Sequence, residues 1–288
     1  MKRMLYLLLM VIGSLGAMPA WGQSVLYAAD GRGTVGNLYI LNPANGAVVT
    51  TVGSIGFSVT GLAIHPITGI MYGSTGRESG PSLASLITIN KTTGAGTLIG
   101  AFNVGGDTMA DLTFTPDGTL YGWNEPSVGG LNTVNLATGQ ATLVGNAGIV
   151  GSSGSGLAAN ASGTLFYAGS RDGGPLRTVD RVTGAPTTVA TLTGIENTPI
   201  NALAFSPANV LFASTKSRNL LSINTGTGAV SVLGATVFDI DAIVFDGAQV
   251  TSTAVPTLSG WALIAMALLL SAIVVLQLRR KNRRASST

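Results

Sequence analysis

The segment Asn135-Leu-Ala-Thr-Gly139 belongs to a turn signature that occurs five times along the chain. The other copies are Asn42-Pro-Ala-Asn-Gly46, Asn90-Lys-Thr-Thr-Gly94, Asp180-Arg-Val-Thr-Gly184 and Asn224-Thr-Gly-Thr-Gly228, and successive copies are 48, 45, 45 and 44 residues apart. The opening Asn or Asp can hydrogen-bond its own backbone two residues on, and the closing Gly tolerates a positive φ. Each copy therefore predicts a tight hairpin.

Two further markers repeat with nearly the same spacing. Aromatic residues recur at Tyr27, Tyr72, Tyr121, Phe166 and Phe212, and apolar runs begin at Leu62, Leu112, Leu157, Leu203 and Ile243. In the second unit the markers predict four short strands at residues 61–65, 70–74, 86–90 and 96–102. Four strands in a repeat of about 45 residues are typical of one blade of a β-propeller.

The ends of the repeat region predict how the ring closes. The first unit starts at the aromatic strand around Tyr27 and lacks a first strand, whereas residues 241–245 form a first strand without a unit of their own. Pairing of these strands completes the first blade and removes exposed sheet edges. The sequence therefore predicts an all-β, five-bladed β-propeller over residues 23–248.

This region resembles the broad group of bacterial extracellular propellers with Asn/Asp-x-x-Thr-Gly hairpins. That resemblance implies an architecture but no function, because such propellers include binding, scaffolding and enzymatic members.

Composition restricts the functions open to the propeller. The chain has no cysteine, which excludes disulfides, thiolate catalysis and Cys-ligated metals. Between residues 23 and 250 there are eight basic and twelve acidic residues, a net charge of −4. A mildly acidic domain lacks the basic surface that nucleic acids require, so no nucleic-acid partner is expected.

The first 22 residues have the pattern of a secretory signal peptide. Lys2 and Arg3 precede the apolar run 4–12, and small residues at Ala20 and Gly22 precede the expected cleavage before Gln23. The chain is therefore predicted to be exported.

The other end predicts a membrane span. After the linker and motif at 249–258, residues 259–278 are uncharged and long enough for a transmembrane helix. The cytoplasmic tail at 279–288 follows from the positive-inside rule, and it contains Arg279, Arg280, Lys281, Arg283 and Arg284. This topology places the propeller outside the cytoplasm.

The segment before the span resembles the IPTL-CTERM sorting signal of Gram-negative bacteria. Pro256, Thr257, Leu258 and Trp261 match that pattern, Val255 replaces Ile, and Ala262 stands where Gly is usual. The resemblance implies processing by an exosortase-type membrane protease, with an inner-membrane intermediate before delivery to the cell surface. Proline keeps residues 255–256 extended, a form a protease can grip. The alternative is an ordinary anchor that keeps the protein facing the periplasm.

The candidate ligand face consists of loops. In propellers the loops joining second and third strands share one face with the loops between blades, and thirteen of the domain's twenty charges map there. The candidate residues are Asp107, Asp111, Trp123, Glu125, Arg171, Asp172, Asp239 and Asp241, with Trp123 as a stacking platform for a glycan. The alternative is that long loops simply carry charge.

Other chemistry is weakly indicated. His65 is interpreted as a turn residue rather than a general base, the Gly-rich stretch 145–156 as an inter-blade loop, and no zinc or copper site is expected. No cofactor is predicted, although calcium bound in the central channel stays open as an alternative.

We therefore expect a binding or scaffolding module for extracellular glycan or protein, without catalysis. The alternative is a glycosidase or lactonase-like hydrolase that uses carboxylates at the channel mouth.

Overall fold

The computed structural model describes residues 24–31, 35–105, 108–125, 128–150, 154–169, 174–195, 199–237 and 240–247. The predicted signal peptide, linker, transmembrane helix and basic tail lie outside these residues. Within them, no helix is long and apolar enough to span a membrane.

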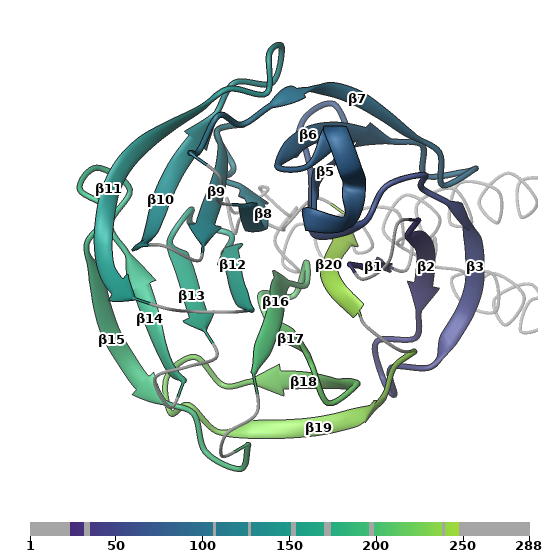
Figure 1. Ribbon diagram of the computed structural model, residues 1–288. Coiled ribbons are helices and arrows are strands. Elements are labelled where there is room, and N and C mark those ends of the chain that lie inside the picture. Colours follow the sequence, from purple (N-terminus) through teal and green to yellow (C-terminus); the bar gives the residue numbers. More distant parts are fainter. Residues whose placement is uncertain are drawn as a thin grey trace, which may run out of the picture. The chain divides into compact units, whose positions relative to one another are not determined.

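The described chain forms five four-stranded antiparallel sheets around a common axis, which confirms the five-bladed propeller (Figure 1). Blade 1 consists of β20 (Ile240–Asp246), β1 (Val25–Asp30), β2 (Asn37–Leu41) and β3 (Val48–Ser54). Blade 2 consists of β4 (Val59–Ile64), β5 (Met71–Thr75), β6 (Ser85–Ile89) and β7 (Gly96–Ala101), with the 3₁₀ helix η1 (Arg77–Ser82) between β5 and β6.

The other three blades follow the same order from the axis outward. Blade 3 consists of β8 (Thr108–Phe114), β9 (Leu120–Glu125), β10 (Val128–Val134) and β11 (Ala141–Val150). Blade 4 consists of β12 (Ser155–Ala159), β13 (Leu165–Gly169), β14 (Pro175–Val179) and β15 (Pro186–Thr191). Blade 5 consists of β16 (Ile200–Phe205), β17 (Leu211–Thr215), β18 (Asn219–Ile223) and β19 (Val230–Ala235).

The last strand closes the ring as predicted. β20 pairs antiparallel with β1, so that Val25 lies opposite Asp246 and Ala28 opposite Ile243. The strands predicted for the second unit agree with β4–β7 to within two residues. One prediction was wrong: residues 145–150 are not an inter-blade loop, because β11 continues to Val150 in pairing with β10.

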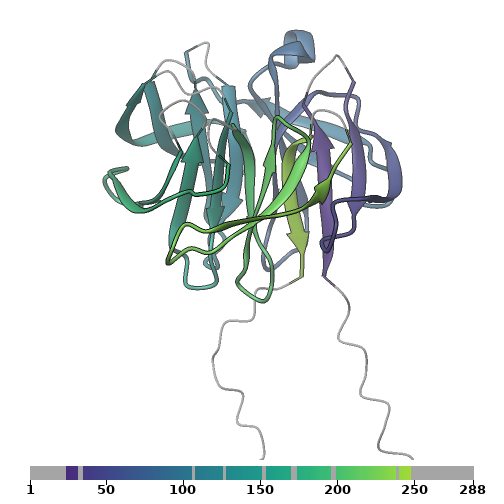
Figure 2. The ribbon, with the colours of Figure 1, turned by 90° about the horizontal axis from the view of Figure 1, so that it is seen from below.

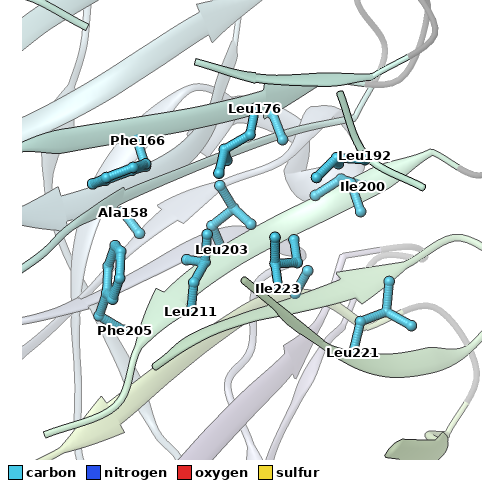
Figure 3. Packing of buried hydrophobic residues seen from close by; sticks show 12 residues of the cluster. Ala158, Phe166, Leu176, Leu192, Ile200, Leu203, Phe205, Leu211, Leu221 and Ile223 are labelled. Atoms are coloured by element: carbon cyan, nitrogen blue, oxygen red, sulfur yellow. The ribbon is translucent and has the colours of Figure 1, made fainter. Parts of the chain in front are cut away.

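The hydrophobic core is divided into five clusters, and each lies between two neighbouring blades. Figure 3 shows the cluster between blades 4 and 5, where Leu176 and Leu203 are fully buried. Phe166 of blade 4 meets Phe205 of blade 5 edge to face, with ring centroids 5.3 Å apart. Because both faces of a blade are covered, inner strands are apolar almost throughout rather than alternating.

The five turn signatures adopt the same conformation. In each, the closing glycine donates its N–H to the carbonyl of the opening Asn or Asp at 2.8–2.9 Å and has a φ between +70° and +83°. The opening side chain accepts a hydrogen bond from the N–H two residues on, as Asn90 Oδ1 does from Thr92 at 2.8 Å. The hairpins predicted from the sequence are therefore present.

These turns also lock neighbouring blades together at the rim. A Cβ added to Gly139 would lie 2.3 Å from the carbonyl oxygen of Gly100 on the outer strand of the preceding blade, and Gly94 stands in the same relation to Gly53. The backbones are thus in direct contact. Each outer strand has a register shift at an aliphatic residue just before this contact. The sequence signal that reveals the contact is the pair aliphatic–small at 52–53, 99–100, 144–145, 189–190 and 233–234.

Candidate functional site

Strand registers define one face of the propeller, here called the loop face. In every blade the first, inner strand begins opposite the residue at which the second strand ends, as in the pairs Asp30–Ile240, Thr108–Glu125 and Ser155–Gly169. The loops between second and third strands therefore lie at the same face as the loops between blades. Figure 2 shows η1 on this face, opposite the end where β1 begins and β20 stops.

Asp111 does not lie on the loop face but at the axis of the ring, where it is completely buried. The equivalent positions on the other inner strands are Gly61, Gly156, Ala202 and Ala242. The space there is narrow, since a Cβ on Gly61 would lie 2.7 Å from the Cα of Asp111. Four small residues thus leave room for one aspartate.

The carboxylate of Asp111 joins three blades. Its Oδ2 accepts hydrogen bonds from the N–H groups of Leu157 on β12 at 2.9 Å and Leu203 on β16 at 3.1 Å, and its Oδ1 accepts one from Leu112 at 2.8 Å. Burial raises the pKa of Asp111 well above its usual range, although the three N–H donors act in the opposite direction. Asp111 is therefore a structural centre and is closed to a ligand.

Trp123 is also absent from the surface. Its side chain is 0% exposed and stacks on Tyr167 of blade 4, with ring centroids 4.0 Å apart. The position faces the neighbouring blade because it lies directly opposite Asp111 in the β8–β9 pairing. The sequence placed the indole beside a loop, whereas the sheet register turns it into the core. It cannot serve as the predicted stacking platform.

Glu125 does reach the loop face, at the end of β9. It is half-buried, and its Oε2 accepts a hydrogen bond from Ser155 Oγ at 3.0 Å while its Oε1 accepts one from the Gly154 N–H at 3.3 Å. Ser155 Oγ is also hydrogen-bonded to Tyr167 at 3.1 Å. The result is a polar chain that runs from the buried interface of blades 3 and 4 to the surface.

Two further carboxylates, Asp30 and Asp241, lie at the loop-face end of blade 1. Asp241 Oδ1 accepts a hydrogen bond from Asn201 Nδ2 at 2.7 Å, and Asp30 Oδ2 accepts one from the Tyr39 hydroxyl at 3.1 Å. A Cβ on Gly31 would overlap Asp241, so the backbone at Gly31 lies directly against this carboxylate. The participation of Tyr39 and Asn201 depends on strand pairing and could not be seen in the sequence.

The other candidate residues are placed less fully. Asp107, Arg171, Asp172 and Asp239 lie outside the described residues. Among those described, exposed cations of the loop-face loops are Arg77, Lys216 and Arg218. The described part of the chain contains no group of three or more His, Asp or Glu side chains able to hold a metal. The calcium alternative stays a prediction.

His65 lies in the turn between β4 and β5, at the end of the blade opposite the loop face. Its Nδ1 accepts hydrogen bonds from the N–H groups of Ile67 and Thr68, each at 3.2 Å, and its ring packs on Phe114. This is the turn role predicted for it. A pocket of about 340 Å³ at the same end of blade 4 is lined by the turns at 162–165 and 178–181 and is separate from the loop face.

The fold and the tail together define an exported class of protein, a five-bladed β-propeller followed by a C-terminal sorting motif. The particular signal is the IPTL-CTERM motif, whose family model matches residues 253–280. This match confirms the predicted sorting motif but covers only the tail.

Other comparisons define the fold alone. No curated protein matches the chain, whereas 904 chains of solved structures do. A crystal structure of a nidogen/laminin complex aligns with a TM-score of 0.53 at 12% identity, covering 78% of this chain and 99% of that one. A provisionally assigned gluconolactonase aligns with a TM-score of 0.50 at 13% identity, covering 80% and 87%. Such identities leave the function open.

Proposed function

We propose that this protein is an exported, surface-sorted propeller whose loop face binds or scaffolds extracellular glycan or protein without catalysis. The observation that carries the proposal is the separation of two ends of the propeller. The polar loops occupy one end, and the chain enters and leaves at the other, where Val25 pairs with Asp246. The described chain therefore enters and leaves the propeller at the end opposite the polar loops.

The tail supports delivery to the surface. The IPTL-CTERM motif starts at residue 253, shortly after the last propeller strand, and an exosortase-type membrane protease is its proposed partner. Before processing, residues 259–278 would hold the protein in the inner membrane, with Arg279 and the basic residues after it in the cytoplasm.

Intact mass measurement on protein from the membrane and medium fractions of the native host tests the sorting step. We expect the mature pool to lack the segment that follows the 255–258 region. The Pro256→Ala variant should accumulate uncleaved, because the extended segment presented to the protease is no longer fixed. A mature wild-type pool that still ends at Thr288 would leave only a permanent, periplasm-facing anchor.

The hydrolase alternative has one observation in its favour, the half-buried carboxylates Asp30, Glu125 and Asp241 at the loop face. All three already accept hydrogen bonds from protein groups, which suits structural roles better than catalysis. An enzyme would need a carboxyl group with a perturbed pKa that faces a substrate.

A paired screen separates binding from hydrolysis. Glycans and lactones are tested for binding and turnover with wild type, with the cation variant Arg77→Ala/Lys216→Ala, and with the acid variant Glu125→Gln/Asp241→Asn. We expect no turnover, and a loss of binding of about tenfold in the cation variant, equivalent to about 1.4 kcal/mol. Arg181→Ala, at the opposite end of blade 4, is the matched control and should bind as wild type. Turnover that disappears in the acid variant would establish the hydrolase instead.

A further inference from the structure

The rim of the propeller consists of five open sheet edges. β3, β7, β11, β15 and β19 are each the last strand of their sheet, and among the described residues no further strand pairs with the outer side of any of them. None of these strands contains an Asp, Glu, Lys or Arg residue. Soluble proteins commonly protect open edges with charged side chains, above all Lys, and this rim lacks that protection.

Each outer strand also exposes an aliphatic side chain. These are Val49 at 63%, Leu98 at 47%, Leu143 at 59%, Val189 at 40% and Val232 at 58% exposure. The charged residues of the domain lie on the loops, the turns and the inner three strands. The described outer strands therefore form an uncharged wall with exposed aliphatic side chains between two charged ends.

The register shifts limit how strongly one edge can pair. In blades 2 to 5 the outer strand pairs regularly over three residues before its shift, as in Gly96–Leu98 of β7 and Val230–Val232 of β19, whereas β3 has an additional shift directly after Val48. A bulge bends and twists the strand, so a single edge offers a short template. The five outer strands of one ring compensate for the weak pairing of each, because several weak contacts made by the same molecule reinforce one another.

We propose that the rim is a self-association surface, on which the outer strand of a second copy of this chain adds edge to edge. A second copy fits because it brings the same uncharged edges, and antiparallel pairing of like edges uses only backbone groups and small side chains. The net charge of −4 on the propeller opposes contact between the charged ends of two copies but not between their neutral rims.

The points where the described chain enters and leaves the propeller agree with lateral contact. The chain enters at Val25 and leaves after Asp246, at one end of the ring and not on an outer strand. Self-association at the rim does not depend on what the loop face binds. It would turn single propellers into an array whose loop faces all remain available.

The absence of cysteine makes a direct test available. Single cysteines are introduced into the full chain, Leu98→Cys or Val232→Cys on the rim, and the membranes are treated with a mild oxidant. We expect disulfide-linked dimers from both variants. Ile67→Cys is the matched control, because Ile67 is an aliphatic residue with 77% exposure in the turn between β4 and β5, at the end of the ring rather than on an outer strand. It should give several-fold less dimer.

A second variant asks whether the edge itself makes the contact. Thr97→Lys beside Leu98→Cys adds the charge that protected edges carry, and we expect it to reduce the dimer several-fold while the circular dichroism spectrum stays unchanged. Rim and control cysteines that cross-link equally, or a dimer that Thr97→Lys leaves intact, would overturn the proposal. Arg77→Ala/Lys216→Ala combined with Leu98→Cys should cross-link as Leu98→Cys alone does, so a failure of loop-face binding is distinguishable from a failure of the rim.

Discussion

Replacing Asp111 with alanine is expected to lower the free energy of unfolding by about 3–6 kcal/mol. The change removes the acceptor of three buried N–H groups, and each unsatisfied group costs about 1–3 kcal/mol. The affected N–H groups belong to β8, β12 and β16, so the loss weakens the contact of three blades at the axis. Denaturant unfolding followed by circular dichroism measures the effect.

Asp111→Asn keeps the size of the side chain and one acceptor oxygen, so we expect about half of that loss. Asp117→Asn is the control, because the Asp117 side chain is 59% exposed and lies in a turn. It should cost less than about 1 kcal/mol. An Asp111→Ala protein as stable as wild type would show that the axis does not need this carboxylate.

A comparison of wild type with Asp111→Asn at several pH values tests the titration of Asp111. Since its pKa is raised in the folded state, folding binds the proton more tightly, and wild-type stability from this group decreases as the pH rises through the folded pKa. Asparagine does not titrate. The stability deficit of Asp111→Asn should therefore shrink as the pH rises above about 4, the usual pKa range of an unfolded aspartate, and a deficit that grows would contradict the raised pKa.

Gly139→Ala is expected to destabilise the propeller by about 2–5 kcal/mol, the other large effect. Gly139 has a φ of +79°, which costs an alanine about 1–2 kcal/mol. The added Cβ would also overlap the Gly100 carbonyl oxygen at 2.3 Å, and forcing the blades apart adds about 1–3 kcal/mol. Thermal unfolding of the variant measures the total.

Gly69→Ala separates the two contributions. Gly69 has a φ of +69°, but an added Cβ would meet no atom closer than Lys91 Nζ at 3.9 Å. It should lose only the backbone part, about 1–2 kcal/mol. Equal losses in the two variants would mean that the close backbone contact at the rim contributes nothing.

The structure assigns different roles to several of the candidate ligand residues. The carboxylate of Asp111, which the sequence placed on the ligand face, joins inner strands at the axis, and the ring of Trp123, which was expected to stack on a ligand, lies in the core. Glu125 and Asp241 do reach the loop face, but each carboxylate accepts a hydrogen bond from a neighbouring blade, Glu125 from Ser155 and Asp241 from Asn201. These contacts favour a rigid binding surface over a catalytic centre, and they direct the binding test toward the exposed cations.

The number of blades, their strand order and the closing strand followed from the sequence alone. These features depend on the residues of each turn and on the spacing of apolar residues. Both patterns recur along the sequence once per blade, as the turn signatures at 90–94 and 135–139 show. The motif at 253–280 was equally visible, because a sorting signal is read as a linear segment. Which side chains meet across blades was decided only by the tertiary structure. Asp111 reaches Leu203 from 92 positions away because ring closure brings all the inner strands to one axis, and no local pattern encodes that distance.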